Sequence, residues 1–275
     1  MGVVLGVDIG GSATKIVGFS PRYEPVGELI VKATDQVTSM YGAIGHFSQK
    51  FGVPLHNIKK ILLTGVGATF SDEDIFGIST EKVDEFIATG YGGLHLAAMA
   101  EAFVVSMGTG TAFVRASKSG ITHIGGSGVG GGTLLGLSSI MLNRGNIDAV
   151  RALAENGNTE NVDLLVKDII AYEIPLLPAG LTASNFGNVR GAASEADIAA
   201  GILNMVFQTI GMLSVFASIN DTIKTFILTG TLTEFPQAKD IFETIGVIHD
   251  VKFIIPHNAV FATAIGAAVS YIESL

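Results

Sequence analysis

A short segment near the N-terminus carries the residues best suited to bind a phosphate group. It reads Asp8-Ile9-Gly10-Gly11-Ser12-Ala13-Thr14-Lys15. Paired glycines let backbone N–H groups converge on an anion, while Ser12 adds a hydroxyl donor and Lys15 a positive charge. Asp8 supplies a carboxylate for Mg²⁺, directly or through water. The segment therefore predicts a triphosphate site, with an ordinary hairpin carrying a solvated lysine as the alternative.

A second glycine segment repeats this pattern about a hundred residues further along the chain. The apolar run 102–107 leads into Gly108-Thr109-Gly110-Thr111, and another apolar run follows it. Two strand ends are also alike, because Leu63-Thr64-Gly65 in one half resembles Leu228-Thr229-Gly230-Thr231 in the other. The repeat predicts two similar halves whose hairpins face each other across a cleft. Gly108, Thr109 and Gly110 would then hold phosphates from the second side, and Gly230 and Thr231 would lie beside the nucleoside.

The densest glycine run of the chain follows the second hairpin. Eight of the seventeen residues from Gly120 to Gly136 are glycine. An apolar helix is predicted directly after the run, and the exposed amides at a helix N-terminus favour an anion. We therefore expect Gly131, Gly132, Thr133, Leu134 and Leu135 to contact ATP. Gly126, Gly128 and Gly131 also fit the dinucleotide spacing G-x-G-x-x-G, so a Rossmann site is an alternative, although the preceding strand is short.

Composition and missing motifs remove several classes of function. The 275 residues include no cysteine, which excludes thiolate zinc sites, iron–sulfur clusters and cysteine nucleophiles. A formal net charge of -9 argues against nucleic-acid binding, which needs a basic face. The sequence contains neither a Gly-Lys P-loop dipeptide nor a G-x-S-x-G elbow, and the six histidines lack metal-ligand spacing.

The elements that must position these residues alternate along the chain between strands and helices. Strands are expected at 3–8, 14–19, 60–65, 102–107, 112–116, 225–230 and 251–255. Helices are expected at 37–51, 88–100, 133–143, 147–156, 195–219 and 235–245, with a closing helix after 260 and a loop around Pro175 and Pro178. This order predicts an α/β fold with largely parallel sheets. We place the two lobes at 1–100 and 101–275, with a cleft between them.

One stretch is long enough to cross a membrane. Residues 198–220 carry no formal charge, but polar side chains interrupt them and Asp197 and Asp221 flank them without a positive-inside signal. A buried helix of a soluble protein is therefore the preferred interpretation, and no membrane association is expected. The absence of a basic, apolar leader and of cysteine fits a cytoplasmic protein. The amount of apolar surface on this helix also predicts a homodimer.

Taken together in this order, the segments resemble the acetate and sugar kinase, Hsp70 and actin superfamily, and within it the type II pantothenate kinases. The matches are Asp8–Ser12, Val83–Phe86, Met107–Thr111, Gly125–Gly132, Leu181–Gly187, and Asn258–Phe261 leading into Ala264–Ala267. The superfamily hairpin alone is generic. The Thr-Ala-Ser-Asn-Phe-Gly block and the glycine run are far more specific, and the matches extend over most of the chain.

The resemblance implies a duplicated actin-like, ribonuclease H-like fold and ATP-dependent phosphorylation of the primary hydroxyl of pantothenate, with Mg²⁺ as cofactor. It places the catalytic acid at Glu85, the metal carboxylate at Asp8, and substrate contacts at His123, Gly125 and Asn185. From the residues alone, Glu85 is one of three acids near a helix start, with Glu81 and Asp84, and only the resemblance singles it out. Members of the family pair through a long helix, which agrees with the predicted homodimer.

One departure from the family pattern lies just before the glycine run. This chain has His123 where the family usually carries an arginine that helps to hold the substrate. Histidine cannot reproduce a guanidinium fork, so substrate choice is open to question unless Arg115 or Arg144 compensates. Two alternatives therefore stay open: a kinase for another small alcohol, such as an N-acetylated amino sugar, and a nucleotide-switched binding protein without a phosphorylated acceptor.

Overall fold

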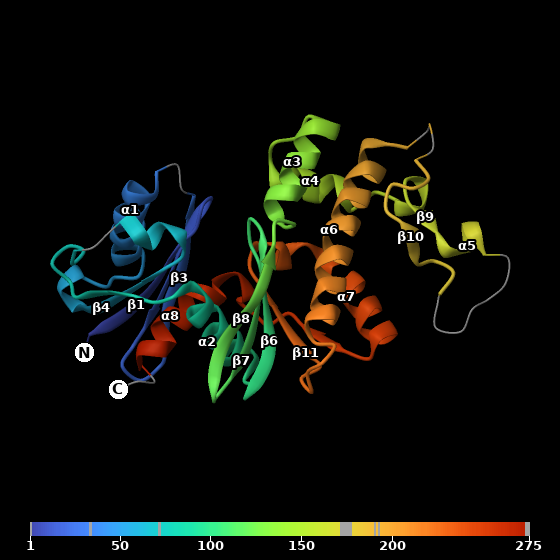
Figure 1. Ribbon diagram of the computed structural model, residues 1–275. Helices are drawn as coiled ribbons and strands as arrows, with labels where there is room; N and C mark the ends of the chain where they lie inside the picture. Colours follow the sequence, from blue (N-terminus) through green and yellow to red (C-terminus); the bar gives the residue numbers. More distant parts are fainter. Residues whose placement is uncertain are drawn as a thin grey trace.

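Two five-stranded sheets form the framework of the molecule. The computed structural model describes residues 2–32, 35–70, 73–170, 178–189, 191 and 193–272. The first sheet has the strand order β3-β2-β1-β4-β5, and the second has the order β8-β7-β6-β11-β12 (Figure 1). The strands of the first are β1 (Val3–Ile9), β2 (Ala13–Phe19), β3 (Pro25–Lys32), β4 (Ile58–Thr64) and β5 (Thr80–Lys82). Those of the second are β6 (Glu101–Met107), β7 (Thr111–Ser117), β8 (Gly120–Ser127), β11 (Thr225–Thr229) and β12 (Lys252–Ile254).

The two sheets repeat one topology. In each, a three-stranded antiparallel meander comes first, and its first strand then pairs in parallel with the fourth, which pairs in parallel with the fifth. The internal duplication predicted from the glycine hairpins thus extends to all five strands of each sheet. The expectation of largely parallel sheets is wrong, because two of the four pairings in each sheet are antiparallel. Strands β3 and β8 were not expected, and β8 runs through the first half of the glycine-rich stretch.

The helices cover the outer and inner faces of the sheets. Helix α1 (Gln36–Lys50) covers the outer face of the first sheet, and its N-cap Asp35 accepts a hydrogen bond from the Thr38 amide at 2.7 Å. On the outer side of the second sheet lie α3 (Gly131–Leu142), α4 (Ile147–Ala154), α6 (Glu195–Ala217) and α7 (Pro236–His249). Beyond α6, the short elements β9 (Leu164–Leu165), α5 (Val166–Ile169) and β10 (Thr182–Ser184) project from the body (Figure 1). Pro175 lies outside the described residues.

The two remaining helices connect the lobes, because each packs on the sheet that lies on the other side of the boundary expected at residue 100. Helix α2 (Glu85–Ala97) comes before that boundary but packs on strands β6, β7 and β8 of the second sheet. Helix α8 (Ala262–Ile272) comes after it but packs on β1, β2 and β4 of the first sheet. The strands therefore divide at residue 100, whereas the inner helices are exchanged between the halves.

Helices α2 and α8 cross each other at unusually close range. A Cβ on Gly92 would lie 1.8 Å from the Ala262 carbonyl oxygen, and one on Gly266 would lie 1.7 Å from the Ala88 carbonyl oxygen. The hydroxyls of Thr89 and Thr263 are 3.4 Å apart at the same crossing. Only glycine at both positions allows the two backbones to touch, and the crossing joins the lobes directly behind the cleft.

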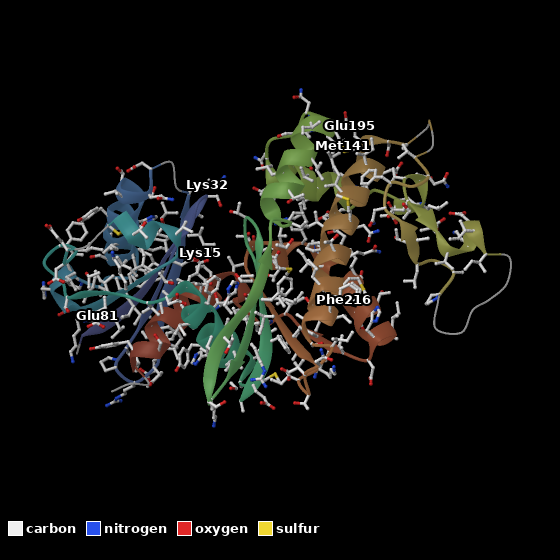
Figure 2. The ribbon with its side chains drawn as sticks, viewed as in Figure 1. Lys15, Lys32, Glu81, Met141, Glu195 and Phe216 are labelled. Atoms are coloured by element: carbon white, nitrogen blue, oxygen red, sulfur yellow. The ribbon has the colours of Figure 1, made fainter. Side chains whose placement is uncertain are left out.

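The long charge-free stretch forms α6, the central helix of the second lobe. It is long and apolar enough to cross a membrane by length and composition, but 61% of its most apolar window is buried inside the protein. Ile202, Val206 and Phe207 pack into the main core of the second lobe. Burial on this scale is expected of a core helix. Phe216, near its C-terminal end, is 59% exposed (Figure 2).

Candidate active site

A cleft of about 580 Å³ lies between the two lobes, where the hairpins of both sheets meet. Most of the residues predicted for ATP and substrate line it: Asp8, Gly10, Gly11, Ser12, Lys15, Glu85, Gly108, Thr109, Gly110, His123, Gly230 and Thr231. They come from strand ends and turns far apart in the chain. The duplicated sheets bring them together, since equivalent hairpins point into one space from opposite sides.

Asp8 and Lys15 form a charged pair on the floor of the cleft. They are register partners on β1 and β2, and Lys15 Nζ lies 3.5 Å from Asp8 Oδ2. Figure 2 shows Lys15 on the side of the first lobe that faces the second. Asp8 is only 7% exposed, and this burial raises the pKa of its carboxyl, while the Lys15 ammonium opposes the rise. A buried carboxylate with one nearby cation fits a divalent ion as a further partner.

The strand beside Asp8 approaches it closely. Thr64 on β4 is the parallel register partner of Asp8, and its buried hydroxyl has no hydrogen-bond partner in the described chain. Gly65 follows with φ +83°, and a Cβ there would lie 2.5 Å from Asp8 Oδ1. Glycine is therefore required for the strand end to pass beside the carboxylate.

The structure separates the three acids that the sequence leaves equivalent. Glu81 forms an ion pair with Lys60 away from the cleft. Asp84 is the N-cap of α2, where its Oδ1 accepts hydrogen bonds from the amides of Phe86 and Ile87 at 2.9 and 3.0 Å. Glu85, the first residue of α2, lines the cleft. Of the three, only its carboxylate faces the space between the hairpins.

The surroundings of Glu85 make it a better proton acceptor than an ordinary glutamate. Desolvation raises the pKa of its carboxyl, and the nearby charges of Asp8 and Asp84 raise it further, whereas Lys15 lowers it. A raised pKa in a cleft is the property expected of a general base, because it increases the affinity of the carboxylate for a proton.

His123 lies against α2 in the same cleft. Its ring stacks on Phe86 with 3.7 Å between ring centroids and an interplanar angle of 8°. Both residues line the cleft beside Glu85. The two arginines that were considered as substitutes for the family arginine are engaged elsewhere. Arg115 Nε donates to Asp221 Oδ2 at 2.6 Å, and Arg144 Nη2 donates to Glu195 Oε2 at 3.0 Å, and neither residue lines the cleft.

The second half of the glycine run has a different role from the one expected. The amides of Gly131 and Gly132 donate to the carbonyl oxygens of Gly108 and Thr109 at 2.8 and 2.9 Å. A Cβ on Gly130 would lie 2.7 Å from the Thr109 carbonyl oxygen. The N-terminus of α3 thus supports the second hairpin from behind. These two amides are bonded to protein, so they are not free to bind a phosphate as arranged here.

The remaining predicted residues do not line the cleft. Thr133 donates its hydroxyl to the Gly128 carbonyl oxygen at 2.8 Å, and the Leu134 side chain is fully buried in the core of the second lobe. Leu135 lies on α3, and Gly125 on β8 pairs with Phe113 on β7 without reaching the cleft. Asn185 follows β10 and donates to Gln208 Oε1 on α6 at 3.4 Å. Asn185 is therefore not brought to the cleft within one chain.

Several cleft residues were not predicted. Gly65, Phe86, Ser106, Ser127 and Thr263 also line it. The sequence does carry a signal for Gly65, because it occupies the same place in the repeated Thr-Gly strand end as Gly230, which is predicted to lie beside the nucleoside. Thr263 carries no local signal, since it reaches the cleft only through the packing of α8 on the first lobe. The described residues contain no cluster of three or more potential metal ligands, so Asp8 would hold a divalent ion with help from a ligand and water.

The architecture defines the class of protein. Two duplicated α/β lobes with facing glycine hairpins form the actin-like ATPase fold. Solved structures of this fold cover nearly the whole chain. The activator of the 2-hydroxyisocaproyl-CoA dehydratase from Clostridium difficile, with bound ADPNP, has a TM-score of 0.71 at 16% identity. The superposition covers 99% of this chain and 95% of the activator chain. The ROK hexokinase from Thermus thermophilus has a TM-score of 0.59 at 12% identity, and the superposition covers 99% of this chain and 100% of the hexokinase chain.

The family model named Fumble matches residues 99–245, more than half of the chain, and the chain belongs to this family. The type II pantothenate kinase of Staphylococcus haemolyticus strain JCSC1435 is 27% identical over 96% of this chain and 98% of the relative. The type II pantothenate kinase of Staphylococcus saprophyticus is 28% identical over 96% of this chain and 98% of the relative. That of Bacillus cereus strain G9842 is 27% identical over 82% of this chain and 83% of the relative. The resemblance stated from the sequence is therefore confirmed.

Proposed function

We propose that this protein is an ATP-dependent kinase that phosphorylates pantothenate on its primary hydroxyl, the first step towards coenzyme A. The observation that carries the proposal is the position of Glu85, whose carboxylate lies in a cleft between two glycine hairpins. Membership of the Fumble family and the full-length similarity to type II pantothenate kinases support the choice of acceptor. Nothing in this arrangement requires a bound nucleic acid or a membrane, and we place the enzyme in the cytoplasm.

The hairpins would hold the triphosphate of ATP from both sides. Gly11 and Ser12 would present backbone and hydroxyl donors from the first lobe, and Thr109 and Gly110 would do so from the second. The amides of Gly10 and Gly108 donate within their own hairpins, to the carbonyl oxygens of Ala13 and Gly110 at 3.1 and 2.9 Å. The second hairpin is held in place for this role, because amides at the N-terminus of α3 donate to its carbonyl oxygens on the side away from the cleft. Mg²⁺ held by Asp8 would neutralise phosphate charge during transfer, and Lys15 contributes a further positive charge.

Glu85 would take the proton from the acceptor alcohol as its oxygen attacks the γ-phosphate. The new bond joins the alcohol oxygen to the phosphorus, the bond to the β-phosphate oxygen breaks, and ADP leaves. A positioned base of this kind contributes about 10²- to 10⁴-fold in rate. Most of the remaining rate enhancement would come from positioning and charge neutralisation.

Because His123 stands where the family carries an arginine, a second acceptor is also a candidate. Within the described lining of the cleft, Lys15 is the only lysine or arginine, and it already pairs with Asp8. A carboxylate-bearing acceptor would gain less here than beside an arginine. An uncharged alcohol such as an N-acetylated amino sugar is therefore the alternative substrate, on the same catalytic groups.

A homodimer is proposed as the working form. Phe216 and Ile219, at the end of α6 and just beyond it, are 59% and 67% exposed, which is unusual for such large apolar side chains. A second copy covering this end of α6 would remove them from water. Sedimentation at micromolar concentration tests this, and a single 28.5 kDa species would contradict it.

The function is tested by measuring ADP release with pantothenate and with N-acetylglucosamine, using the unmodified protein and Glu85→Gln. We expect pantothenate-dependent turnover that falls at least about a hundredfold in the variant, with ATP affinity little changed. Glu81→Gln is the matched control and should retain full activity, because Glu81 lies outside the cleft. Activity on the sugar alone would reassign the substrate, and unchanged turnover in Glu85→Gln would remove Glu85 from the mechanism.

A further inference from the structure

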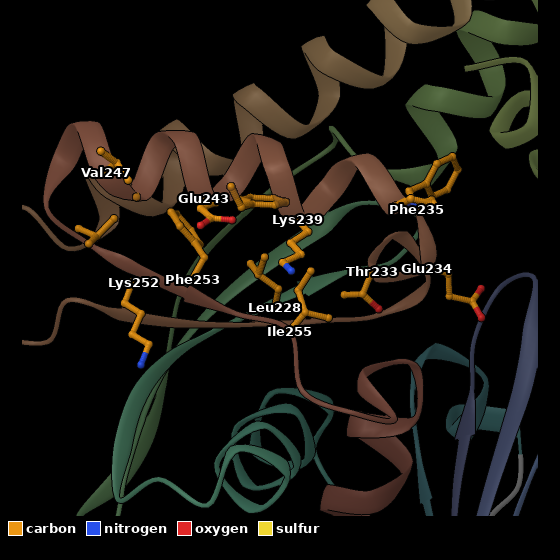
Figure 3. Close-up of a pocket in the computed structure, with 14 residues that line it drawn as sticks. Leu228, Thr233, Glu234, Phe235, Lys239, Glu243, Val247, Lys252, Phe253 and Ile255 are labelled. Carbon is orange, nitrogen blue, oxygen red and sulfur yellow. The ribbon is translucent and has the colours of Figure 1, made fainter. Parts of the chain in front are cut away.

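A second cavity of about 860 Å³ lies beneath α7, outside the ATP cleft. Its lining comes from β11, from the turn η4 (Thr231–Glu234), from α7, and from β12 with the residues that flank it (Figure 3). None of these lining residues also lines the cleft. The two spaces lie on either side of one turn, since Gly230 and Thr231 face the cleft and Thr233 to Phe235 face this cavity. It is therefore a separate site that the proposed kinase reaction does not use.

The floor of the cavity is apolar. Leu228, Phe235 and Phe242 are buried beneath it, and Phe253 and Ile255 form a half-buried wall. Cavities of roughly 300–1,000 Å³ with apolar walls and few polar groups are typical of small-molecule sites. The volume accommodates an aromatic or branched aliphatic group.

Two charged side chains of solvent-exposed residues border this floor, and neither is paired with another side chain. Lys239 extends from α7 toward Leu228 and Ile255, and Glu243 lies one turn further along the same helix (Figure 3). Neither side chain forms an ion pair or hydrogen bond with any described residue. A lysine four residues before a glutamate is the weaker orientation for a helical ion pair, which agrees with their separation.

The other charges near the cavity are directed elsewhere. Glu234 Oε2 lies 3.5 Å from Arg151 Nη2. Lys252 extends away from α7 in Figure 3. The cavity therefore offers a ligand one ammonium and one carboxylate, one helical turn apart at the edge of an apolar floor.

We propose that this cavity binds a small zwitterion with an apolar side chain, of the class of the apolar α-amino acids. The ligand carboxylate would accept from Lys239, the ligand ammonium would donate to Glu243, and the side chain would occupy the space above Leu228. A hydrocarbon would make no use of either charge, since both residues are exposed to water. A simple carboxylic acid would face Glu243, and a simple amine would face Lys239. A ligand with both charges matches the site, because charge-assisted hydrogen bonds form at each end.

The test is a calorimetric titration of the full chain with L-phenylalanine, 3-phenylpropionate and phenethylamine, which share a ring but differ in their charges. We expect saturable binding of L-phenylalanine at one site per chain, and at least about tenfold weaker binding of the other two compounds. Lys239→Gln and Glu243→Gln should each weaken L-phenylalanine binding to a similar extent. Lys118→Gln and Glu155→Gln, at exposed positions outside the cavity lining, are the matched controls and should not.

Saturating Mg²⁺ and ATP should leave L-phenylalanine binding in place, because the lining residues of the two spaces do not overlap. The proposal is overturned if L-phenylalanine does not bind, or if the three compounds bind equally. It is also overturned if ATP displaces L-phenylalanine while the α7 variants bind normally, since the compound would then occupy the cleft. Self-association that is lost in Lys239→Gln would assign the cavity to a second copy of the chain instead.

Discussion

Two equivalent threonines in the duplicated hairpins differ in whether their hydroxyls are bonded. Thr14 on β2 pairs in register with Ile9, the last residue of β1, and Thr111 on β7 pairs with Met107, the last residue of β6. They are 0% and 4% exposed. The Thr111 hydroxyl donates to the Val129 carbonyl oxygen at 2.8 Å, whereas the Thr14 hydroxyl has no partner in the described chain.

This difference predicts opposite effects of one substitution. A buried hydroxyl without a partner costs about 1–3 kcal/mol, and valine replaces it with a methyl group of similar size. Thr14→Val should therefore raise the free energy of unfolding by about 1 kcal/mol. Thr111→Val should lower it by about 1–3 kcal/mol, because it leaves the Val129 carbonyl without its donor. In a protein somewhat larger than 250 residues, 1 kcal/mol corresponds to a Tm shift of roughly 2 °C.

Urea denaturation followed by circular dichroism, together with calorimetric Tm values, measures both effects. Thr244→Val on α7 is the control, because its hydroxyl bonds to the Asp240 carbonyl oxygen on the exposed face of the helix. It should change stability by less than about 0.5 kcal/mol. A destabilised Thr14→Val, or shifts of the same sign at both hairpins, would refute the reasoning from hydrogen-bond satisfaction.

Four further outcomes are expected. Gly266→Ala should destabilise the protein by more than about 3 kcal/mol in chemical denaturation, because its Cβ would enter the α2 backbone, while Gly45→Ala, with nothing within 4 Å, should be neutral or stabilising. Glu85→Gln should raise Tm at pH 7 but not in acid, since a raised folded pKa means that the ionised carboxyl costs stability as pH rises through that pKa. The same shift, which belongs to the ligand-free protein, should place the acid limb of the kcat/KM–pH profile above the ordinary glutamate value of 4.5. His123→Arg should lower KM for pantothenate without a comparable change in KM for ATP, because a guanidinium can stack on Phe86 and face a carboxylate.

The duplicated hairpins were predictable because their chemistry is local. Gly10 and Gly11 in one half, and Gly108 and Gly110 in the other, follow apolar strands at matching places, and the sheets place both hairpins at one cleft. The proposed base, Glu85, could not be singled out from the residues alone, since Glu81, Asp84 and Glu85 share one sequence neighbourhood. Their different roles depend on Lys60, on the helix cap and on the cleft, which are tertiary features.

The glycine run shows how a correct signal led to an incomplete interpretation. Its density did indicate close backbone approach. The approach at Gly130 to Gly132, however, is to the second hairpin itself, and the earlier part of the run forms β8. Glycine is disfavoured in strands, so propensity argued against β8, and pairing with β7 outweighed it. Because β3 was not expected either, the duplication could not supply the third meander strand of either sheet.

The exchange of α2 and α8 has a consequence for the order of folding. Val4, Val17 and Leu62 on the inner face of the first sheet are covered by residues of α8, which are made after all of the second sheet. During synthesis the first lobe therefore emerges from the ribosome with this apolar face open. It closes only when residues 262–272 return from the far side of the second lobe. The lobe that is made first is therefore completed last, and exposed apolar surface of this kind makes folding intermediates prone to aggregate.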